Sequence, residues 1–124
     1  MESLTPNLFV NDMNQTIEFY SLLGFTVTMK VPESGDIVWA MMTNGSVNMM
    51  FQTFGSLAEE LPEINRNNGG SLLFWIKVND IRQLYDSIQN KIPILKGLEK
   101  TFYGSTEFSI LDNNKYVLTF AQDE

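Results

Sequence analysis

The chain has 124 residues, 44% of them hydrophobic, which is enough for one ordinary core and predicts a single domain. It has no cysteine and no histidine, which excludes disulfides and thiolate chemistry and removes the usual general base near neutral pH. Its formal net charge of -7 leaves no basic patch for phosphates, so we expect no nucleic-acid partner and a preference for cationic ligands.

The first half of the chain predicts a strand, a helix and then three strands. The alternating segment Leu4–Val10 is followed by Asp12, a residue suited to cap a helix over 13–23. Further along, Asn44-Gly45 joins two strand-like runs, because this dipeptide favours a tight hairpin turn. Apolar runs such as 39–42 are far too short to cross a bilayer, and the N-terminus lacks an export signal. We therefore expect no membrane partner and a cytoplasmic location.

A polar linker is predicted between the two halves, over residues 54–70. Ser56–Leu61, just before Pro62, predicts one or two helical turns. The asparagines and glycines of 65–70 are typical of an exposed loop.

The second half repeats the pattern of the first. Leu72–Val78 predicts a strand, Asp80 a helix cap, and the apolar stripe of residues 81, 84, 85 and 88 a helix. Val78-Asn79-Asp80 repeats Val10-Asn11-Asp12 after 68 positions, and Leu111–Lys115 matches the first hairpin if one residue is inserted. The chain is therefore interpreted as a duplication, with one module over about 1–53 and a second over about 71–124.

The predicted strands have one apolar and one mixed side. The apolar side should face the helices; it consists of Leu4, Pro6, Leu8, Val10, Val47, Met49, Phe51, Leu72, Phe74, Ile76, Val78, Tyr116, Leu118 and Phe120. The mixed side suits a wetter binding cleft, and consists of Thr5, Asn7, Phe9, Asn48, Met50, Gln52, Leu73, Trp75, Lys77, Val117, Thr119 and Ala121.

Several short motifs resemble those of a known family. The first helix carries Ile17-Glu18-Phe19-Tyr20 and is followed by Leu22-Leu23-Gly24-Phe25. The second half has Tyr103-Gly104-Ser105-Thr106-Glu107-Phe108 before a hairpin in which Lys115 replaces a usual glycine. In order and spacing these motifs resemble the vicinal-oxygen-chelate superfamily, which contains glyoxalases, bleomycin resistance proteins and dioxygenases.

The resemblance implies an α+β fold. Two βαβββ modules would form a curved eight-stranded mixed sheet around a cleft, with the helices on the outside. Metal-using members take four ligands from strand positions that correspond here to Thr5, Met50, Leu73 and Thr119. Because leucine and a thioether do not ligate a hard or borderline divalent cation, we expect no metal and no cofactor. Metal-dependent glyoxalase or dioxygenase activity is not expected.

Two functions remain open at this point. One is a metal-free protein that binds an amphipathic small molecule, with cationic ligands favoured. The other is a lyase, isomerase or dioxygenase-type enzyme of the same superfamily that uses non-standard residues such as Glu107, Lys77 or Tyr103. Alternatively, Glu107 is only a structural carboxylate, and Trp75 and Phe9 only close the core. The predicted ligand-binding set is Thr5, Asn7, Phe9, Asn48, Met50, Gln52, Leu73, Trp75, Lys77, Glu107 and Thr119.

Self-association is also predicted. The resemblance implies a homodimer, since members of this family complete the cleft by pairing modules across chains. The free edges of a long sheet also need protection. We expect the first strand, Leu4–Val10, to lie at this interface.

Overall fold

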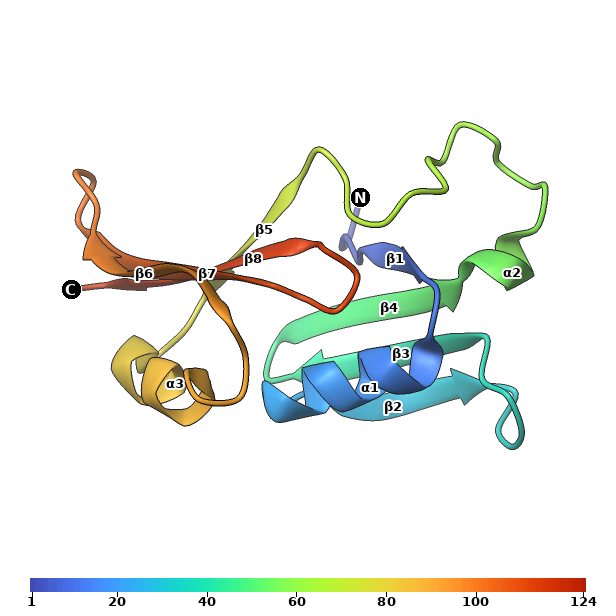
Figure 1. Cartoon of the computed structure of the whole chain (residues 1–124), viewed down its shortest axis with the longest axis horizontal. Helices are drawn as coiled ribbons and strands as arrows, with labels where there is room; N and C mark the ends of the chain where they lie inside the picture. The colour runs from blue at the N-terminus through green and yellow to red at the C-terminus, as the bar shows by residue number, and fades with distance from the viewer. The chain divides into compact units, whose positions relative to one another are not determined.

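A computed structural model describes all residues, 1–124, and divides them into two compact units, Met1–Asn68 and Gly69–Glu124. Each unit has the strand, helix and three-strand order predicted from the sequence (Figure 1). None of its helices has the length and hydrophobicity needed to cross a bilayer.

The first unit contains one mixed sheet covered by a helix. Its elements are β1 (Asn7–Val10), α1 (Met13–Leu22), β2 (Thr26–Val31), β3 (Trp39–Asn44), β4 (Val47–Thr53) and the short α2 (Phe54–Leu57). The strand order is β1-β4-β3-β2, in which only the β1–β4 pair is parallel. Helix α1 lies along one face of this sheet and contacts β2, β3 and β4 (Figure 1).

The second unit repeats this arrangement. Its elements are β5 (Leu73–Lys77), α3 (Ile81–Ile88), β6 (Ile94–Lys100), β7 (Ser105–Leu111) and β8 (Val117–Asp123). The strand order β5-β8-β7-β6 corresponds to that of the first sheet, again with one parallel pair, β5–β8. Helix α3 contacts β7 and β8. The predicted α+β fold of two βαβββ modules is confirmed, with the eight strands in two four-stranded sheets.

The strand registers agree with the duplication. Asn7 pairs with Met50 in the first sheet, and Trp75 pairs with Thr119 in the second, so equivalent pairs are offset by 68 and 69 positions. The inserted residue lies in the second hairpin: Asn44 pairs with Val47 across a two-residue turn, whereas the backbone of Asp112 bonds that of Tyr116 around three residues.

Both long helices begin at the predicted aspartates. Asp12 Oδ1 accepts the backbone N–H of Gln15 at 3.0 Å, and Asp80 Oδ1 accepts that of Gln83 at 3.1 Å. Each cap satisfies one of the free amides in the first helical turn. Aromatic contacts then hold the helices on the sheets, since the ring of Tyr20 lies 4.7 Å from that of Phe51 and Tyr85 lies 5.1 Å from Phe108.

The side of each sheet that faces its helix forms the core, as the apolar pattern predicted, except that Leu4 and Leu72 lie outside the strands and are exposed. Leu8, Val10 and Phe51 in the first unit and Leu118 and Phe120 in the second are buried. We call the opposite side of each sheet, which its own helix does not cover, the inner face. Side chains there are mostly half-buried or exposed.

Two boundaries differ from the prediction. Strand β1 begins at Asn7 rather than Leu4, because Pro6 has no N–H to donate to a ladder and contributes only its carbonyl, which accepts the Met50 amide. Helix α2 spans Phe54–Leu57 rather than 56–61. Thr53 Oγ1 caps it through the amide of Ser56, and Ala58, with a φ of 53°, ends it.

Candidate functional site

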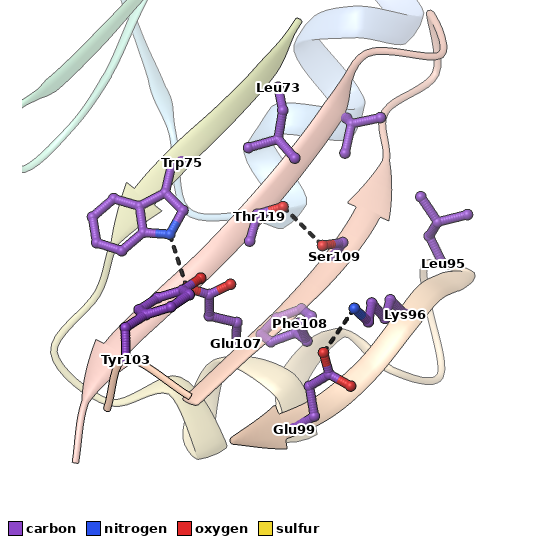
Figure 2. A pocket seen from close by; sticks show the side chains of 11 residues that line it. Leu73, Trp75, Leu95, Lys96, Glu99, Tyr103, Glu107, Phe108, Ser109 and Thr119 are labelled. Atoms are coloured by element: carbon purple, nitrogen blue, oxygen red, sulfur yellow. Dashed lines mark hydrogen bonds and ion pairs between the residues drawn. The ribbon is translucent and has the colours of Figure 1, made fainter. Parts of the chain in front are cut away.

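A cavity of about 570 Å³ opens on the inner face of the second unit (Figure 2). Strands β5, β6, β7 and β8 and the turn between β6 and β7 all contribute to its wall. The lining residues are Leu73, Trp75, Leu95, Lys96, Glu99, Tyr103, Glu107, Phe108, Ser109, Val117 and Thr119. The wall is therefore largely apolar and aromatic, with a few polar groups, as small-molecule sites usually are.

Glu107 is the most strongly hydrogen-bonded of the ionisable groups in the cavity. Its Oε2 accepts bonds from Trp75 Nε1 at 3.0 Å, from the Tyr103 hydroxyl at 2.7 Å and from Ser105 Oγ at 2.9 Å. Figure 2 shows the rings of Trp75 and Tyr103 next to this carboxylate. Its second oxygen, Oε1, makes no hydrogen bond within the chain. Glu107 is thus held in place while one oxygen remains available.

The same hydrogen bonds determine the ionisation of this pair. Partial burial opposes the charged form of Glu107, but the donors on Oε2 outweigh burial, so the pKa of Glu107 lies below its ordinary value. The hydrogen bond to Glu107 raises the pKa of Tyr103 above its ordinary value. At neutral pH the site therefore holds a carboxylate beside a neutral phenol.

Two further polar pairs lie in the wall. Lys96 Nζ is 2.7 Å from Glu99 Oε1, so this ammonium is already paired with a carboxylate. Ser109 Oγ and Thr119 Oγ1 are 2.8 Å apart and share one hydrogen bond, and both residues are buried. Because Lys96 neutralises only one of the two carboxylates, the cavity retains a negative charge at Glu107.

Most predicted residues of the second module line this cavity. Leu73, Trp75, Tyr103, Glu107 and Thr119 do so. Lys77 does not, and its Nζ instead pairs with Asp123 Oδ2 at 2.8 Å. On the inner face Ala121 stands between Lys77 and Glu107, which puts their backbones about 10 Å apart, two strand spacings.

The predicted residues of the first module lie in the first unit. Asn7, Phe9, Met50 and Gln52 are half-buried on the inner face of β1 and β4. Asn48, on the same face, is exposed and accepts a hydrogen bond from Thr43 Oγ1 at 2.7 Å. Thr5 is half-buried and precedes β1.

Seven lining residues lie outside the predicted ligand-binding set: Leu95, Lys96, Glu99, Tyr103, Phe108, Ser109 and Val117. Tyr103 was a candidate catalytic residue, and Val117 was predicted to lie on the cleft side of its strand. Ser109 and Val117 alternate with Glu107 and Thr119, so extending the period-two pattern along β7 and β8 identifies them. Strand β6 was harder to predict, because register shifts between Ile94, Lys96 and Glu99 break the alternation. The Lys96–Glu99 spacing was its only local signal.

The four positions that carry metal ligands in the resembling family do not fit a metal here. Leu73 has no donor atom, Met50 has only a thioether, and the hydroxyl of Thr119 already bonds Ser109. No group of three or more histidine, cysteine, aspartate or glutamate side chains comes together anywhere in the chain. The chemistry supported by these residues is hydrogen bonding, charge and apolar contact.

The comparisons with known proteins agree with this fold. The family model of the Glyoxalase/Bleomycin resistance protein/Dioxygenase superfamily matches residues 4–120. Among solved structures, TioX from Micromonospora sp. ML1 matches with a TM-score of 0.79 at 17% identity, over 100% of both chains. A bleomycin-binding protein complexed with bleomycin matches with a TM-score of 0.70 at 20% identity, also over 100% of both chains.

A bleomycin resistance determinant encoded on the transposon Tn5 matches with a TM-score of 0.72 at 20% identity, over 100% of this chain and 99% of that one. At these identities the likeness establishes the shared fold alone. A search of the curated proteins finds no match.

Proposed function

Because the chain belongs to the glyoxalase/bleomycin resistance protein/dioxygenase superfamily, we propose that it is a metal-free binding protein for an amphipathic, cationic small molecule. The observation that carries this proposal is the cavity of about 570 Å³ in the second unit, with apolar and aromatic walls and a charged carboxylate, Glu107. A volume of this size suits a drug-sized ligand.

The arrangement around Glu107 supports a cationic ligand. Its Oε2 is occupied by three donors, whereas Oε1 can accept a hydrogen bond from an ammonium or a similar group. Trp75, 49% exposed, and Tyr103 offer aromatic surfaces next to that oxygen, and aromatic faces attract cations. The chain's net charge of -7 also favours the approach of a cation.

The same geometry favours binding over proton transfer. A general base works best with a pKa near the working pH, whereas the pKa of Glu107 is lowered by its donors. Tyr103, with its pKa raised, is a weaker acid than an ordinary phenol. An enzyme that relied on these groups would need to reverse both effects, so we favour ligand binding over the alternative of catalysis by non-standard residues.

The fold neighbours give limited support to this proposal. Two of them are described as a bleomycin-binding protein with bleomycin and as a bleomycin resistance determinant. Other proteins with this fold therefore bind small molecules. The ligand of the present chain is proposed from its own residues and not from bleomycin.

Fluorescence titration of Trp75 tests the proposal. In a Trp39→Phe background Trp75 is the only tryptophan. We expect benzylammonium to quench it saturably, with weaker binding of benzyl alcohol and none of benzoate. Glu107→Gln should weaken binding of the cation by about tenfold, because the substitution removes the charge from a hydrogen-bonding group. Asp86→Asn is the matched control, since Asp86 is an exposed carboxylate on α3 that lies outside the cavity. Equal binding of the three probes, or an unchanged affinity in Glu107→Gln, would refute the cationic site.

Metal independence requires a separate measurement. Added zinc, nickel or iron should leave the melting temperature unchanged, since a ligand that binds only the folded state raises it. Metal retained in stoichiometric amount after purification, and lost on replacing Thr5 or Thr119, would show that the binding-protein interpretation is wrong.

A further inference from the structure

The inner face of the first unit differs in chemistry from the cavity of the second. Its side chains form two rows that run across all four strands of the sheet. One row is Asn7, Met50, Met41 and Met29, and the other is Phe9, Gln52, Trp39 and Val31. Neither row contains a charged residue. Met29 and Val31 are 61% and 53% exposed, and the other six are half-buried.

Two amides lie diagonally opposite each other in these rows. Asn7 Nδ2 donates to Gln52 Oε1 at 3.0 Å, and this is the one side-chain hydrogen bond of each residue. Asn7 Oδ1 is buried without a partner, the only such side-chain atom in the chain. A shielded acceptor that makes no hydrogen bond is costly, so it strongly favours any donor that can reach it.

Free donors accompany this acceptor. Gln52 Nε2 makes no hydrogen bond within the chain, and neither does the indole N–H of Trp39, its neighbour across the β3–β4 ladder. If both amides were rotated by 180°, the pair would still present one free acceptor and one free donor. The face therefore offers one free acceptor and one free donor in either assignment, with the acceptor on Asn7 in one and on Gln52 in the other.

We propose that the inner face of the first unit binds a planar aromatic or heterocyclic carboxamide. The N–H of the carboxamide donates to Asn7 Oδ1, its carbonyl accepts from Gln52 or Trp39, and its ring lies on the methionine row. Methionine suits this role, because its flexible, polarisable side chain adapts to flat ligands and contacts aromatic rings favourably. The inference deepens the proposed function, since it names a neutral group that the same protein would recognise. It does not depend on Glu107 or on charge.

The buried acceptor becomes available by a small motion. Both amides end in an sp³–sp² torsion, which is broad and low in energy, and no second hydrogen bond fixes either of them. Rotation of the Asn7 amide exchanges its oxygen and nitrogen, so that the acceptor comes to the position that Nδ2 occupied and Nδ2 takes the buried position. The hydrogen bond to Gln52 is then replaced by one from the ligand.

Methionine methyl NMR provides the test, with benzamide as the probe. Three of the seven methionines, Met29, Met41 and Met50, lie on the inner face, whereas Met13, Met42 and Met49 are buried in the core and serve as internal controls. We expect benzamide to shift the inner-face methyl signals saturably and to leave the three core signals unchanged. Acetophenone, which keeps the ring and the carbonyl but has no N–H, should bind about tenfold more weakly.

Two leucine variants isolate the hydrogen bond. Asn7→Leu should abolish the preference for benzamide over acetophenone, and Gln52→Leu should lower the affinity for benzamide. Thr43→Val, on the same face but outside the two rows, should change neither affinity. Absent or uniform methyl shifts, equal affinities for the two probes, or an unchanged preference in Asn7→Leu would overturn the proposal.

The Glu107→Gln variant separates this proposal from the cationic site of the second unit. It should bind benzamide normally while losing affinity for benzylammonium. Loss of benzamide binding in Glu107→Gln would contradict the independence of the two sites. Normal binding of the ammonium by a protein that ignores benzamide would refute the carboxamide site alone.

Discussion

At the scale of single residues, the donors around Glu107 have a consequence for stability. Because they lower the pKa of Glu107 in the folded state below the ordinary value of 4.5, the ionised carboxylate stabilises the fold. This stabilisation is fully present above pH 4.5 and is lost as the pH falls through the lower folded-state pKa. We therefore expect Glu107→Gln to lower the melting temperature at pH 7, by an amount that shrinks as the pH is lowered below 4.5.

Thermal unfolding of both proteins across this pH range measures the effect. Asp86→Asn is the control, since Asp86 is an exposed carboxylate on α3 that lies outside the cavity. A difference between wild type and Glu107→Gln that grows on acidification would contradict the predicted sign.

Two glycines with similar backbone angles should respond differently to substitution. Gly69 and Gly104 have φ values of 77° and 88°, where any side chain is strained. A Cβ at Gly69 would lie 2.7 Å from the backbone oxygen of Lys115, whereas nothing lies within 4 Å of one at Gly104. Gly104→Ala should cost about 1 kcal/mol, and Gly69→Ala about 1–3 kcal/mol more, because the clash is with backbone. Urea denaturation would measure both losses of unfolding free energy. Equal losses would show that the Lys115 carbonyl moves easily to relieve the clash.

At the scale of elements, the aspartate caps give the clearest prediction. Asp12 and Asp80 each accept one amide in the first turn of a helix, and neither lines the cavity. Replacing either with alanine should cost about 1 kcal/mol of unfolding free energy and leave ligand affinity unchanged. Asp12→Asn and Asp80→Asn should recover most of the loss, because asparagine caps about equally well. A loss of affinity at unchanged stability would instead place these residues in the binding machinery.

Local chemistry explains which elements were predictable. The caps, the Asn44-Gly45 turn and the alternation of the inner strands are set by neighbours in sequence, and all of them are found. Strand β1 begins later than the apolar alternation predicts, because Pro6 fits the apolar pattern but cannot donate to the ladder. Helix α2 begins earlier than the sequence predicts, because Thr53, the last residue of β4, caps it.

The candidate site was less predictable, since its contacts join distant parts of the chain. Alternation placed Trp75 and Glu107 on one face, but not the hydrogen bond between them across 32 positions. The pairing of Lys77 with Asp123, 46 positions away, was likewise invisible in the sequence. Periodicity identifies the face on which a residue lies, whereas its partner there depends on strand order and register.

At the scale of the whole molecule, the duplication has kept the backbone and changed the chemistry. Asn7 of the first unit and Trp75 of the second occupy equivalent register positions, and so do Trp39 of the first unit and Glu107 of the second. Tryptophan therefore occupies a different position in each unit. Met41 corresponds to Ser109, and Met50 to Thr119. One inner face is neutral and rich in methionine, and the other is aromatic with a carboxylate.

Self-association is the remaining prediction at this scale. Strands β1 and β2 form the two edges of the first sheet, and an unpaired strand edge invites pairing unless it is protected. The register shift between Val27 and Met29 makes β2 irregular, whereas β1 is short and regular. We therefore propose that a homodimer forms through β1. Sedimentation equilibrium at micromolar concentration should give twice the chain mass of 14.2 kDa. Amides of β1 should exchange more slowly at high protein concentration than at low, while those of β2, the control edge, should not change. A 14.2 kDa species alone, or protection confined to β2, would exclude this dimer.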